Sequence, residues 1–338
     1  VPKRVMQALC YWFYRIKQGG FMLNQLLERA QCYDIETKVE GITNHLPMAL
    51  IALDRLGATP ERLDEYFLSY SEKLKPFQYS AYDQDFNWLE HLGDKDKFNV
   101  YLSFYSDQIS LLGIKLALGK YINRLIQGCA ASAFHALIRL SYGIIQENHK
   151  EIAFGLAHMS SHFIPLPVPM QVNTKPESVI NHALRAFSKY VAVGDSVTKR
   201  ITDISTKPEY SSVNYYPTGL TLRACSKLFS KLYLQSHDFT VLHTVTSCHA
   251  MRVLLPYIDD KDTALKSYWS ASLVAILSIK DLKFNLIIKG EYLGNLDVQA
   301  VINSNDDHTI KLVFSCIEEY KHYNDVNYLK ILSSKLKA

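Results

Sequence analysis

Long runs of apolar residues at helical spacing constrain the fold of this 338-residue chain more than any other feature. Apolar side chains recur every three or four residues through most of the sequence, which is the period of one face of an α-helix. Only 14 glycines interrupt this pattern, and neither strand-like alternation nor a repeat of fixed period is visible. We therefore predict an all-α protein.

Start and stop signals support two of the predicted helices. Asn44 is a plausible cap for a helix that Gly57 ends at about residue 56, and Thr59 followed by Pro60 begins a helix that reaches Leu74. The apolar period predicts further helices over residues 84–92, 96–112, 114–127, 130–147, 150–163, 176–193, 196–204, 218–235, 239–256, 261–279, 306–322 and 324–336. The segment 283–293 fits a strand or a helix equally well.

Prolines 165, 167 and 169 predict one extended connection in the chain. A minor division of the protein is conceivable near residues 164–176. Because nothing there resembles a flexible polar linker, we expect a single compact multi-helix domain over residues 1–338.

Charge and cysteine content exclude several classes of partner and compartment. The 37 Lys and Arg against 33 Asp and Glu give a net charge of 37 − 33 = +4 without a long basic stripe, so nucleic acid is not expected as a partner. The six cysteines show no CxxC pair, which favours a reducing, cytoplasmic location. No apolar stretch reaches the roughly 18 to 20 residues of a membrane span. Residues 1–13 only faintly resemble the start of a signal peptide.

The common catalytic motifs are absent, which leaves the 12 histidines as the main candidates for functional residues. No GxGxxG, GxxxxGK followed by Ser or Thr, HExxH or GxSxG is present. His158 and His162 form an HxxxH pair on one helical face, but they end a helix and lack an adjacent carboxylate. We assign that pair a helix-terminal or surface role. Five others have polar neighbours or lie near helix ends and are expected to be solvated: His91, His149, His182, His237 and His322.

Four histidines lie in or beside apolar runs. His45 opens the segment HLPMALIALDRL, His135 is expected in the middle of a helix, His243 lies in VLHTVTSC, and His308 follows two aspartates. For each one alone, a hydrogen-bonded core histidine is the simpler interpretation. Four separate helices that each offer one histidine are nevertheless how helical bundles build metal sites.

Lys311 lies three residues after His308, on the same helical face, and is followed by Leu312, Val313 and Phe314. Burial lowers the pKa of a lysine. The neutral amine could act as a base, or could add carbon dioxide and become an anionic carbamate ligand. The simpler alternative is a lysine whose stem is buried and whose ammonium group reaches solvent.

Four blocks of sequence together resemble the bacterial branch of the questin oxidase-like family, over roughly residues 22–335. The blocks are GITNHLPMALIALDRLGATPERL, GCAASAFHALIRLSYGI, DFTVLHTVTSCHAMRVLLPYID and DDHTIKLVFSCIEEY. The resemblance implies an oxidoreductase. Fungal relatives open anthraquinone rings by oxygen insertion and have been described as NADPH-dependent Baeyer–Villiger-type oxidases or as non-haem iron dioxygenases.

In the iron version, the resemblance implies a metal-dependent oxygenase that uses dioxygen on an aromatic or polycyclic, quinone-like small molecule. Its metal, iron (Fe²⁺) or another first-row ion, would lie in a buried metal and substrate site between helices. The ion would be held there by the catalytic residues His45, His135, His243, His308 and, as a carboxylated lysine, Lys311. Imidazole and anionic oxygen ligands suit iron. Two alternatives stay open: an NADPH-dependent oxidase without a metal, and a helical binding protein without catalytic activity.

The sequence departs from the fungal pattern near the first two blocks, where Met48 and Arg139 stand in place of additional histidines. His249 lies six residues after His243 and cannot share its helical face. Residues that could orient the ligands are candidates by adjacency only: Asn44, Thr246, Asp306 and Asp307. Arg139, Tyr142 and Trp269 could contact an aromatic substrate, although packing is the preferred interpretation.

Overall fold

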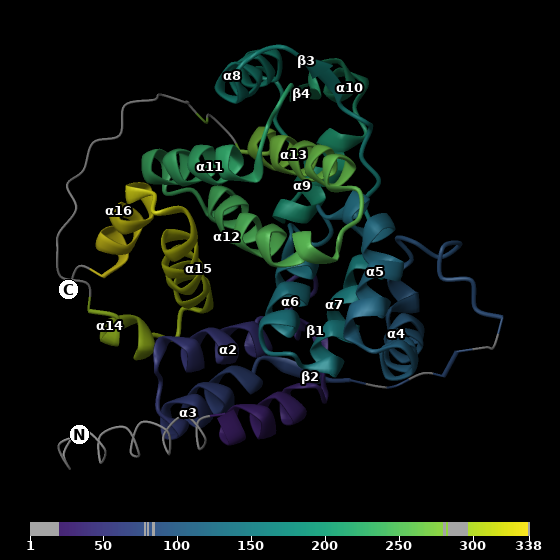
Figure 1. Ribbon diagram of the computed structural model, residues 1–338, viewed down its shortest axis with the longest axis vertical. Helices are drawn as coiled ribbons and strands as arrows, with labels where there is room; N and C mark the ends of the chain where they lie inside the picture. The colour runs from purple at the N-terminus through teal and green to yellow at the C-terminus, as the bar shows by residue number, and fades with distance from the viewer. Residues whose placement is uncertain are drawn as a thin grey trace. The chain divides into compact units, whose positions relative to one another are not determined.

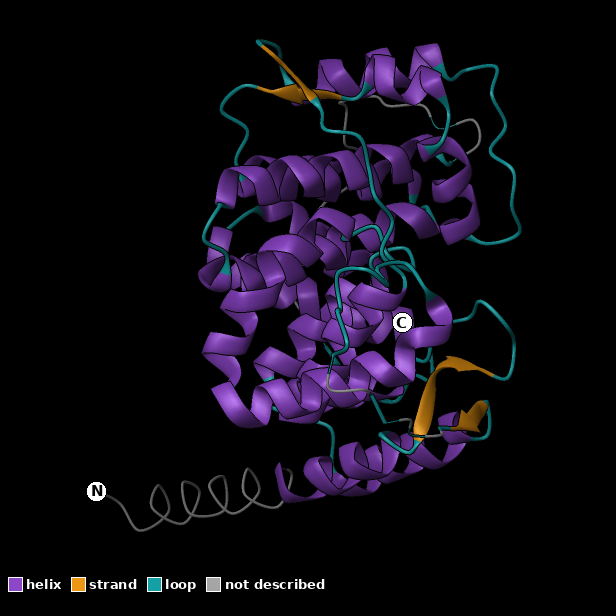
Figure 2. Cartoon of the chain, turned by 90° about the vertical axis from the view of Figure 1, so that its right-hand side faces the viewer, coloured by secondary structure: helices purple, strands orange, loops and turns teal. Residues whose placement is uncertain are grey.

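The computed structural model describes residues 20–77, 79, 81–82, 85–279, 282 and 297–336. Most of these residues are helical, as the periodicity predicts (Figure 1). The strands form two small pairs (Figure 2). The expectations for residues 1–13 and 283–293 lie outside the described residues. None of the helices in the described ranges combines the length and the apolar character that crossing a membrane requires.

Residues 20–30 form the first helical stretch. The further helices are α2 (Leu46–Leu56), α3 (Pro60–Ser71), α4 (Phe98–Leu112), α5 (Ile114–Leu125), α6 (His135–Ile145), α7 (His149–Ser161), α8 (Pro176–Ala186), α9 (Val197–Ser205), α10 (Pro208–Val213), α11 (Leu222–Ser236), α12 (Phe239–Leu254), α13 (Lys261–Leu277), α14 (Gln299–Ile302), α15 (Asp307–Tyr323) and α16 (Val326–Lys335). Short 3₁₀ turns are η1 (Lys95–Lys97), η2 (Ile126–Gly128) and η3 (Leu255–Tyr257). The strands are β1 (Tyr33–Thr37), β2 (Leu74–Pro76), β3 (Met170–Val172) and β4 (Tyr215–Pro217).

The chain divides into two compact units, and the first comprises residues 1–78, 295–314 and 335–338. In this unit β1 pairs antiparallel with β2, and α2 is buried along most of its length. The Asn44 side chain accepts a hydrogen bond from the Leu46 N–H at 2.9 Å, and Gly57 ends α2 at a φ of +94°. The stop at Gly57 is as predicted, since glycine adopts this φ at little cost. The N-cap position is His45, whose side chain makes no capping bond, so Asn44 bonds the helix start from one residue before the predicted cap.

Arg62 fastens the segment before α15 to helix α3. Its Nε donates to the Ile302 carbonyl oxygen at 2.7 Å, and its Nη2 donates to the Ser304 carbonyl oxygen at 2.6 Å and to Asn305 Oδ1 at 2.8 Å. A single guanidinium group thus bonds three acceptors within one four-residue segment, 302–305. The start of α15 is fixed in the first unit by this contact.

The second unit comprises residues 79–294 and 315–334. Here α7 packs against both α6 and α4, and α12 packs against α6 and α11, as Figure 1 shows. The parallel pair of β3 and β4 is the one sheet among the described residues of this unit. Helix α15 belongs to both units, because residues 307–314 lie in the first and residues 315–323 in the second.

Glycine allows α6 and α7 to approach closely in the second unit. A Cβ atom on Gly155 would lie 2.5 Å from Leu140 Cα, and one on Gly143 would lie 2.8 Å from the Ile152 nitrogen. Across the same interface the buried Arg139 guanidinium bonds the Glu151 carboxylate at 3.0 and 3.3 Å. Both side chains of this ion pair are buried. The close contact between α6 and α7 therefore encloses two opposite charges.

Several predicted boundaries are wrong. The second predicted helix ends at Ser71 rather than Leu74, because residues 74–76 pair with β1. Residues 85–92 form turns in place of a helix. The helix predicted over 130–147 begins only at His135, since Ser132, Ala133 and Phe134 all have positive φ. The helices predicted over 176–193 and 218–235 end at Ala186 and begin at Leu222, and the four short strands and α10 were not predicted.

The single domain over residues 1–338 stays a prediction. Residues 163–169 lack regular structure, as the prolines there indicate.

We predict that Gly155→Ala destabilises the protein by about 1–3 kcal/mol, because the new methyl group overpacks a backbone contact. The matched control is Gly119→Ala in α5, where a Cβ meets no atom within 4 Å. That change is expected to stabilise the helix by about 0.5–1 kcal/mol. Urea unfolding of the two variants measures both effects, and equal stabilities would contradict the close approach of α6 and α7.

Candidate functional site

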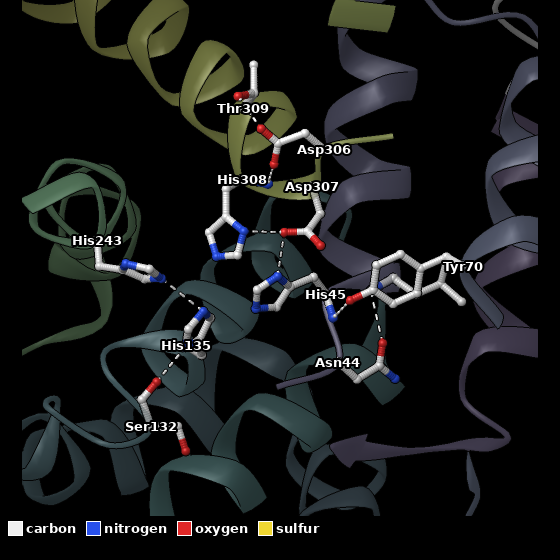
Figure 3. Close-up of polar contacts among 11 residues, drawn as sticks. Asn44, His45, Tyr70, Ser132, His135, His243, Asp306, Asp307, His308 and Thr309 are labelled. Carbon is white, nitrogen blue, oxygen red and sulfur yellow. Dashed lines mark hydrogen bonds and ion pairs between the residues drawn. The ribbon is translucent and has the colours of Figure 1, made fainter. Parts of the chain in front are cut away.

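Two imidazole rings of the first unit converge on one carboxylate oxygen. His45 Nδ1 lies 2.7 Å from Asp307 Oδ1, and His308 Nδ1 lies 2.6 Å from the same atom. The two rings meet edge to face with centroids 4.6 Å apart. Figure 3 shows both rings directed at Asp307. We refer to His45, Asp307, His308 and Lys311 as the Asp307 cluster.

The backbone that carries His45 is fixed on both sides by polar contacts. Asn44 Nδ2 donates to the Asp34 carbonyl oxygen at 2.8 Å. The Tyr70 hydroxyl accepts from the His45 N–H at 3.1 Å, as Figure 3 shows. Asn44 therefore acts on the backbone before α2 and not on the ring of His45. Each of these contacts limits the directions in which the imidazole can point.

Asp306 supports the Asp307 cluster as a helix cap. Its Oδ1 accepts from the His308 N–H at 3.0 Å, and its Oδ2 accepts from Thr309 Oγ1 at 2.6 Å. Ligand atoms of Asp306, Asp307 and His308 also lie within 4.8 Å of one another. Because both oxygens of Asp306 are used in the first turn of α15, this residue positions His308 and is not an obvious metal ligand.

The charges of the cluster fix the tautomer of its rings. Burial tends to raise the pKa of the Asp307 carboxyl, but His45, His308 and Lys311 together hold that pKa well below its usual range. Burial lowers the pKa of His45 to about 3, and the Lys311 charge contributes. An ionised Asp307 can only accept hydrogen bonds, so Nδ1 of each ring carries a proton, and in the neutral His45 ring Nε2 carries the lone pair.

Lys311 is buried one helical turn after His308, at 3% exposure. Burial lowers the pKa of its amine to about 8, while Asp307 and Asp306 act in the opposite direction. No hydrogen bond or ion pair of Lys311 Nζ falls within the described ranges of the chain. The expectation of a desolvated amine is therefore supported in preference to a lysine that reaches solvent.

In the second unit, His135 and His243 face each other across α6 and α12. Their Nε2 atoms are 3.1 Å apart, and both side chains are buried. His135 Nδ1 lies 2.5 Å from the Ser132 carbonyl oxygen, and His243 Nδ1 lies 2.8 Å from the Phe239 carbonyl oxygen. Figure 3 shows His243 and Ser132 on opposite sides of the His135 ring. We call His135 and His243 the imidazole pair.

The geometry of the imidazole pair suits two ligands of one metal ion. A carbonyl oxygen only accepts, so each Nδ1 carries a proton and the two Nε2 lone pairs face each other. Such lone pairs repel unless a cation or a shared proton lies between them. Two nitrogen ligands at about 2.1 Å from a metal and at nearly a right angle are about 3 Å apart, which agrees with the observed separation.

A strained turn places His135 at the start of α6. Ser132, Ala133 and Phe134 have φ values of 47°, 53° and 69°, in the left-handed region that costs roughly 1–2 kcal/mol for each residue other than glycine. The turn brings the Ser132 carbonyl oxygen back to His135 Nδ1. The expectation that His135 lies mid-helix is wrong, because this strained turn replaces the predicted first turn of the helix.

The HxxxH pair ends α7 as predicted, but it is buried rather than at the surface. His158 is 2% exposed and His162 is 8% exposed, and their rings meet edge to face at 4.8 Å. His158 Nε2 bonds Ser132 Oγ at 2.8 Å. Four of the five histidines that we expected to be solvated are exposed, and His91 is intermediate.

His249 is buried on a different face of α12, as its spacing from His243 indicates, and its Nδ1 lies 3.1 Å from Ser315 Oγ. Thr246 bonds carbonyl oxygens of its own helix, so it orients no imidazole. Trp269 Nε1 donates to the Tyr215 carbonyl oxygen at 2.6 Å, and Arg139 bonds Glu151. Both contacts support packing roles for these two residues.

The sequence alone does not indicate which oxygen atoms bond Nδ1 of the four candidate histidines. Asp307 was a candidate by adjacency only, and the carbonyl oxygens of Ser132 and Phe239 were not considered. The Phe239 contact follows the helical i to i−4 spacing and could have been anticipated. The Ser132 contact could not, because it requires the left-handed turn.

Comparison with known families gives one match, which covers most of the chain. A family model described as questin oxidase-like matches residues 42–215 and 221–316, ranges that include the Asp307 cluster and the imidazole pair. No curated protein matches the chain.

We predict that His249 makes the protein less stable in mild acid. Burial, assisted by Arg252, lowers its pKa from 6.5 to about 3, so the unfolded chain gains a proton that the folded protein does not bind. The stability contribution is complete above pH 6.5 and is lost as the pH falls toward 3, by about 2 kcal/mol between pH 7 and pH 5. Denaturant unfolding of wild type and His249→Gln at both pH values measures the difference in slope. The exposed His182→Gln is the control and should leave the slope unchanged; an unchanged slope in His249→Gln contradicts the assignment.

Proposed function

The chain belongs to the questin oxidase-like family, and from this premise we propose that it is a metal-dependent oxygenase. Its substrate is an aromatic or polycyclic small molecule of the quinone type. The family is named for an oxidase, and this name supports an oxidoreductase that acts on an anthraquinone-type compound. The use of iron and dioxygen is what our proposal adds.

The proposed ligands are His45, His135, His243 and His308, bound to one metal ion. His45, His135 and His308 are among the residues of this chain that could hold a metal. One observation carries the proposal: the Nδ1 atom of every one of these four rings bonds an oxygen. This contact leaves Nε2 as the ligand atom, as in metal sites where an oxygen orients the histidine.

Lys311 is proposed as the fifth ligand, in carboxylated form. Its neutral amine attacks carbon dioxide, a nitrogen–carbon bond forms as one carbon–oxygen π bond breaks, and the nitrogen releases one proton, so that a neutral amine becomes an anionic carbamate. The burial of Lys311 and its lowered pKa support this step, because only the neutral amine reacts. One anionic oxygen ligand among neutral imidazoles suits ferrous iron.

When bound, iron supplies the redox chemistry that dioxygen requires. The residues of the chain supply the rest. Asp307 holds the protons of two rings at Nδ1, and carbonyl oxygens do the same for His135 and His243. Burial of the imidazole pair and of Lys311 keeps water away from these donors.

We predict about one iron or other first-row metal ion per chain in protein purified without a histidine tag. His135→Ala and His243→Ala should each abolish stable binding, because each removes one of two facing donors. Asp307→Asn should weaken it by about 10- to 100-fold through the lost orientation of two rings. Elemental analysis and titration with ferrous iron are the measurements.

The matched control is His162→Ala, which removes an equally buried histidine outside the proposed ligand set and should leave the metal content unchanged. Wild-type protein that contains no metal and does not bind added iron would refute the proposal. Oxidation of NADPH by such metal-free protein would favour the oxidase without a metal, and its absence would favour a binding protein.

The carbamate on Lys311 is a separate prediction. Protein incubated with ¹³C-bicarbonate should show one carbamate carbon resonance in its NMR spectrum, and Lys311→Ala should lose it. Lys311→Glu should retain part of the metal affinity, because its carboxylate replaces the anionic oxygen. A wild-type spectrum without that resonance, recorded with metal bound, would contradict the assignment of Lys311.

A further inference from the structure

A cavity of about 360 Å³ lies in the second unit, next to the HxxxH pair. The residues that line it come from η1 and the loop before it, the end of α7 and the first turns of α9, and they include Gly93, Lys95, His162, Thr198, Lys199 and Thr202. Its size is that of a site for a small organic ligand. None of these residues belongs to the Asp307 cluster or to the imidazole pair.

Besides His162, the polar residues that line this cavity are cationic or carry a hydroxyl group. They are Lys95, Lys199, Thr198 and Thr202, beside the apolar Phe163 and Ile164. No Asp or Glu lines the cavity within the residues that the structure describes. The Lys199 ammonium group also pairs with Asp195 at 3.0 Å. Thr198 and Lys199 also lie in the first turn of α9, where the helix dipole favours an anion.

His162 adds a buried acceptor to the same cavity. Ser161 Oγ donates to the Ala157 carbonyl oxygen at 2.9 Å, so it must accept from His162 Nδ1, which is also 2.9 Å away. The lone pair of His162 is therefore on Nε2, and the ring lines the cavity. No hydrogen bond to Nε2 falls within the described part of the chain. Burial and the Lys95 charge lower the pKa of His162 to about 4, so the ring remains an acceptor at neutral pH.

We propose that this cavity binds a phosphorylated sugar, either free or as part of a nucleotide. The phosphate contacts Lys95, Lys199 and the first turn of α9, and a sugar hydroxyl donates to His162 Nε2. An inorganic anion would use only the first set of groups. A neutral sugar would use only the second, so the combination selects a ligand that carries both.

The HxxxH motif gains a function under this proposal that does not involve a metal. His162 contacts the ligand, and His158 packs against His162 while it bonds Ser132 Oγ. The same Ser132 residue holds His135 through its carbonyl oxygen. The buried pair therefore lies between the proposed cavity and the turn that orients one proposed metal ligand.

Titration calorimetry of the full chain with ribose 5-phosphate, AMP and inorganic phosphate tests the proposal. Ribose 5-phosphate and AMP should bind, and inorganic phosphate should bind at least about tenfold more weakly, because it lacks the sugar hydroxyl. Preference for AMP over ribose 5-phosphate would identify a nucleotide, and the reverse a free sugar phosphate. Either of these results supports the shared chemistry.

The double variant Lys95→Ala/Lys199→Ala should weaken binding of the preferred ligand by at least about tenfold. Lys207→Ala is the matched control, because Lys207 pairs with Asp203 four residues earlier in the way that Lys199 pairs with Asp195 but does not line the cavity. The ¹⁵N resonance of His162 Nε2 should shift on ligand addition.

Three outcomes would overturn the proposal. The first is equal binding of inorganic phosphate, the second is an equal loss of affinity in Lys207→Ala, and the third is an unchanged His162 resonance at saturation. Absence of binding by all three probes would overturn it as well. Because none of these measurements requires a metal, the result is independent of the proposed oxygenase activity.

Discussion

The hydrogen bonds to the Asp307 carboxylate fix two of the proposed metal ligands, His45 and His308. One oxygen receives protons from two imidazole rings, His45 from the start of α2 and His308 from the start of α15. One carboxylate oxygen can accept both hydrogen bonds, and its negative charge makes each of them stronger than a bond to a neutral acceptor. The same charge also raises the pKa of the buried Lys311 amine, against the effect of burial.

The second unit reaches the same result with backbone oxygens. His135 and His243 are held at Nδ1 by the carbonyl oxygens of Ser132 and Phe239, which bring no charge into a buried region. This arrangement avoids the desolvation of a carboxylate. Two solutions to one chemical requirement thus occur in one chain, and in both of them Nε2 is the atom left to coordinate.

The sequence predicts the helical class and several boundaries because those depend on local signals, such as Thr59 at the start of α3 and Gly57 after α2. It also selects four histidines and Lys311 as candidate ligands, through apolar context and family resemblance, and this assignment stays a prediction. It does not predict the shared use of Asp307, which joins residues 262 positions apart in the chain. The burial of His158 and His162 was missed for a similar reason, since it results from packing of α7 against α4 and α6. Contacts that depend on tertiary packing leave little trace in one sequence.

The left-handed turn before α6 has a consequence for how this part of the sequence can vary. Ser132, Ala133 and Phe134 adopt a conformation that glycine would adopt with less strain. Glycine at any of the three positions would relieve that strain, but it would also give the unfolded and the folded turn more freedom. The carbonyl oxygen of Ser132 would then hold His135 less firmly. Stability and a fixed imidazole direction therefore impose opposite demands on this turn, and the residues present favour the fixed direction.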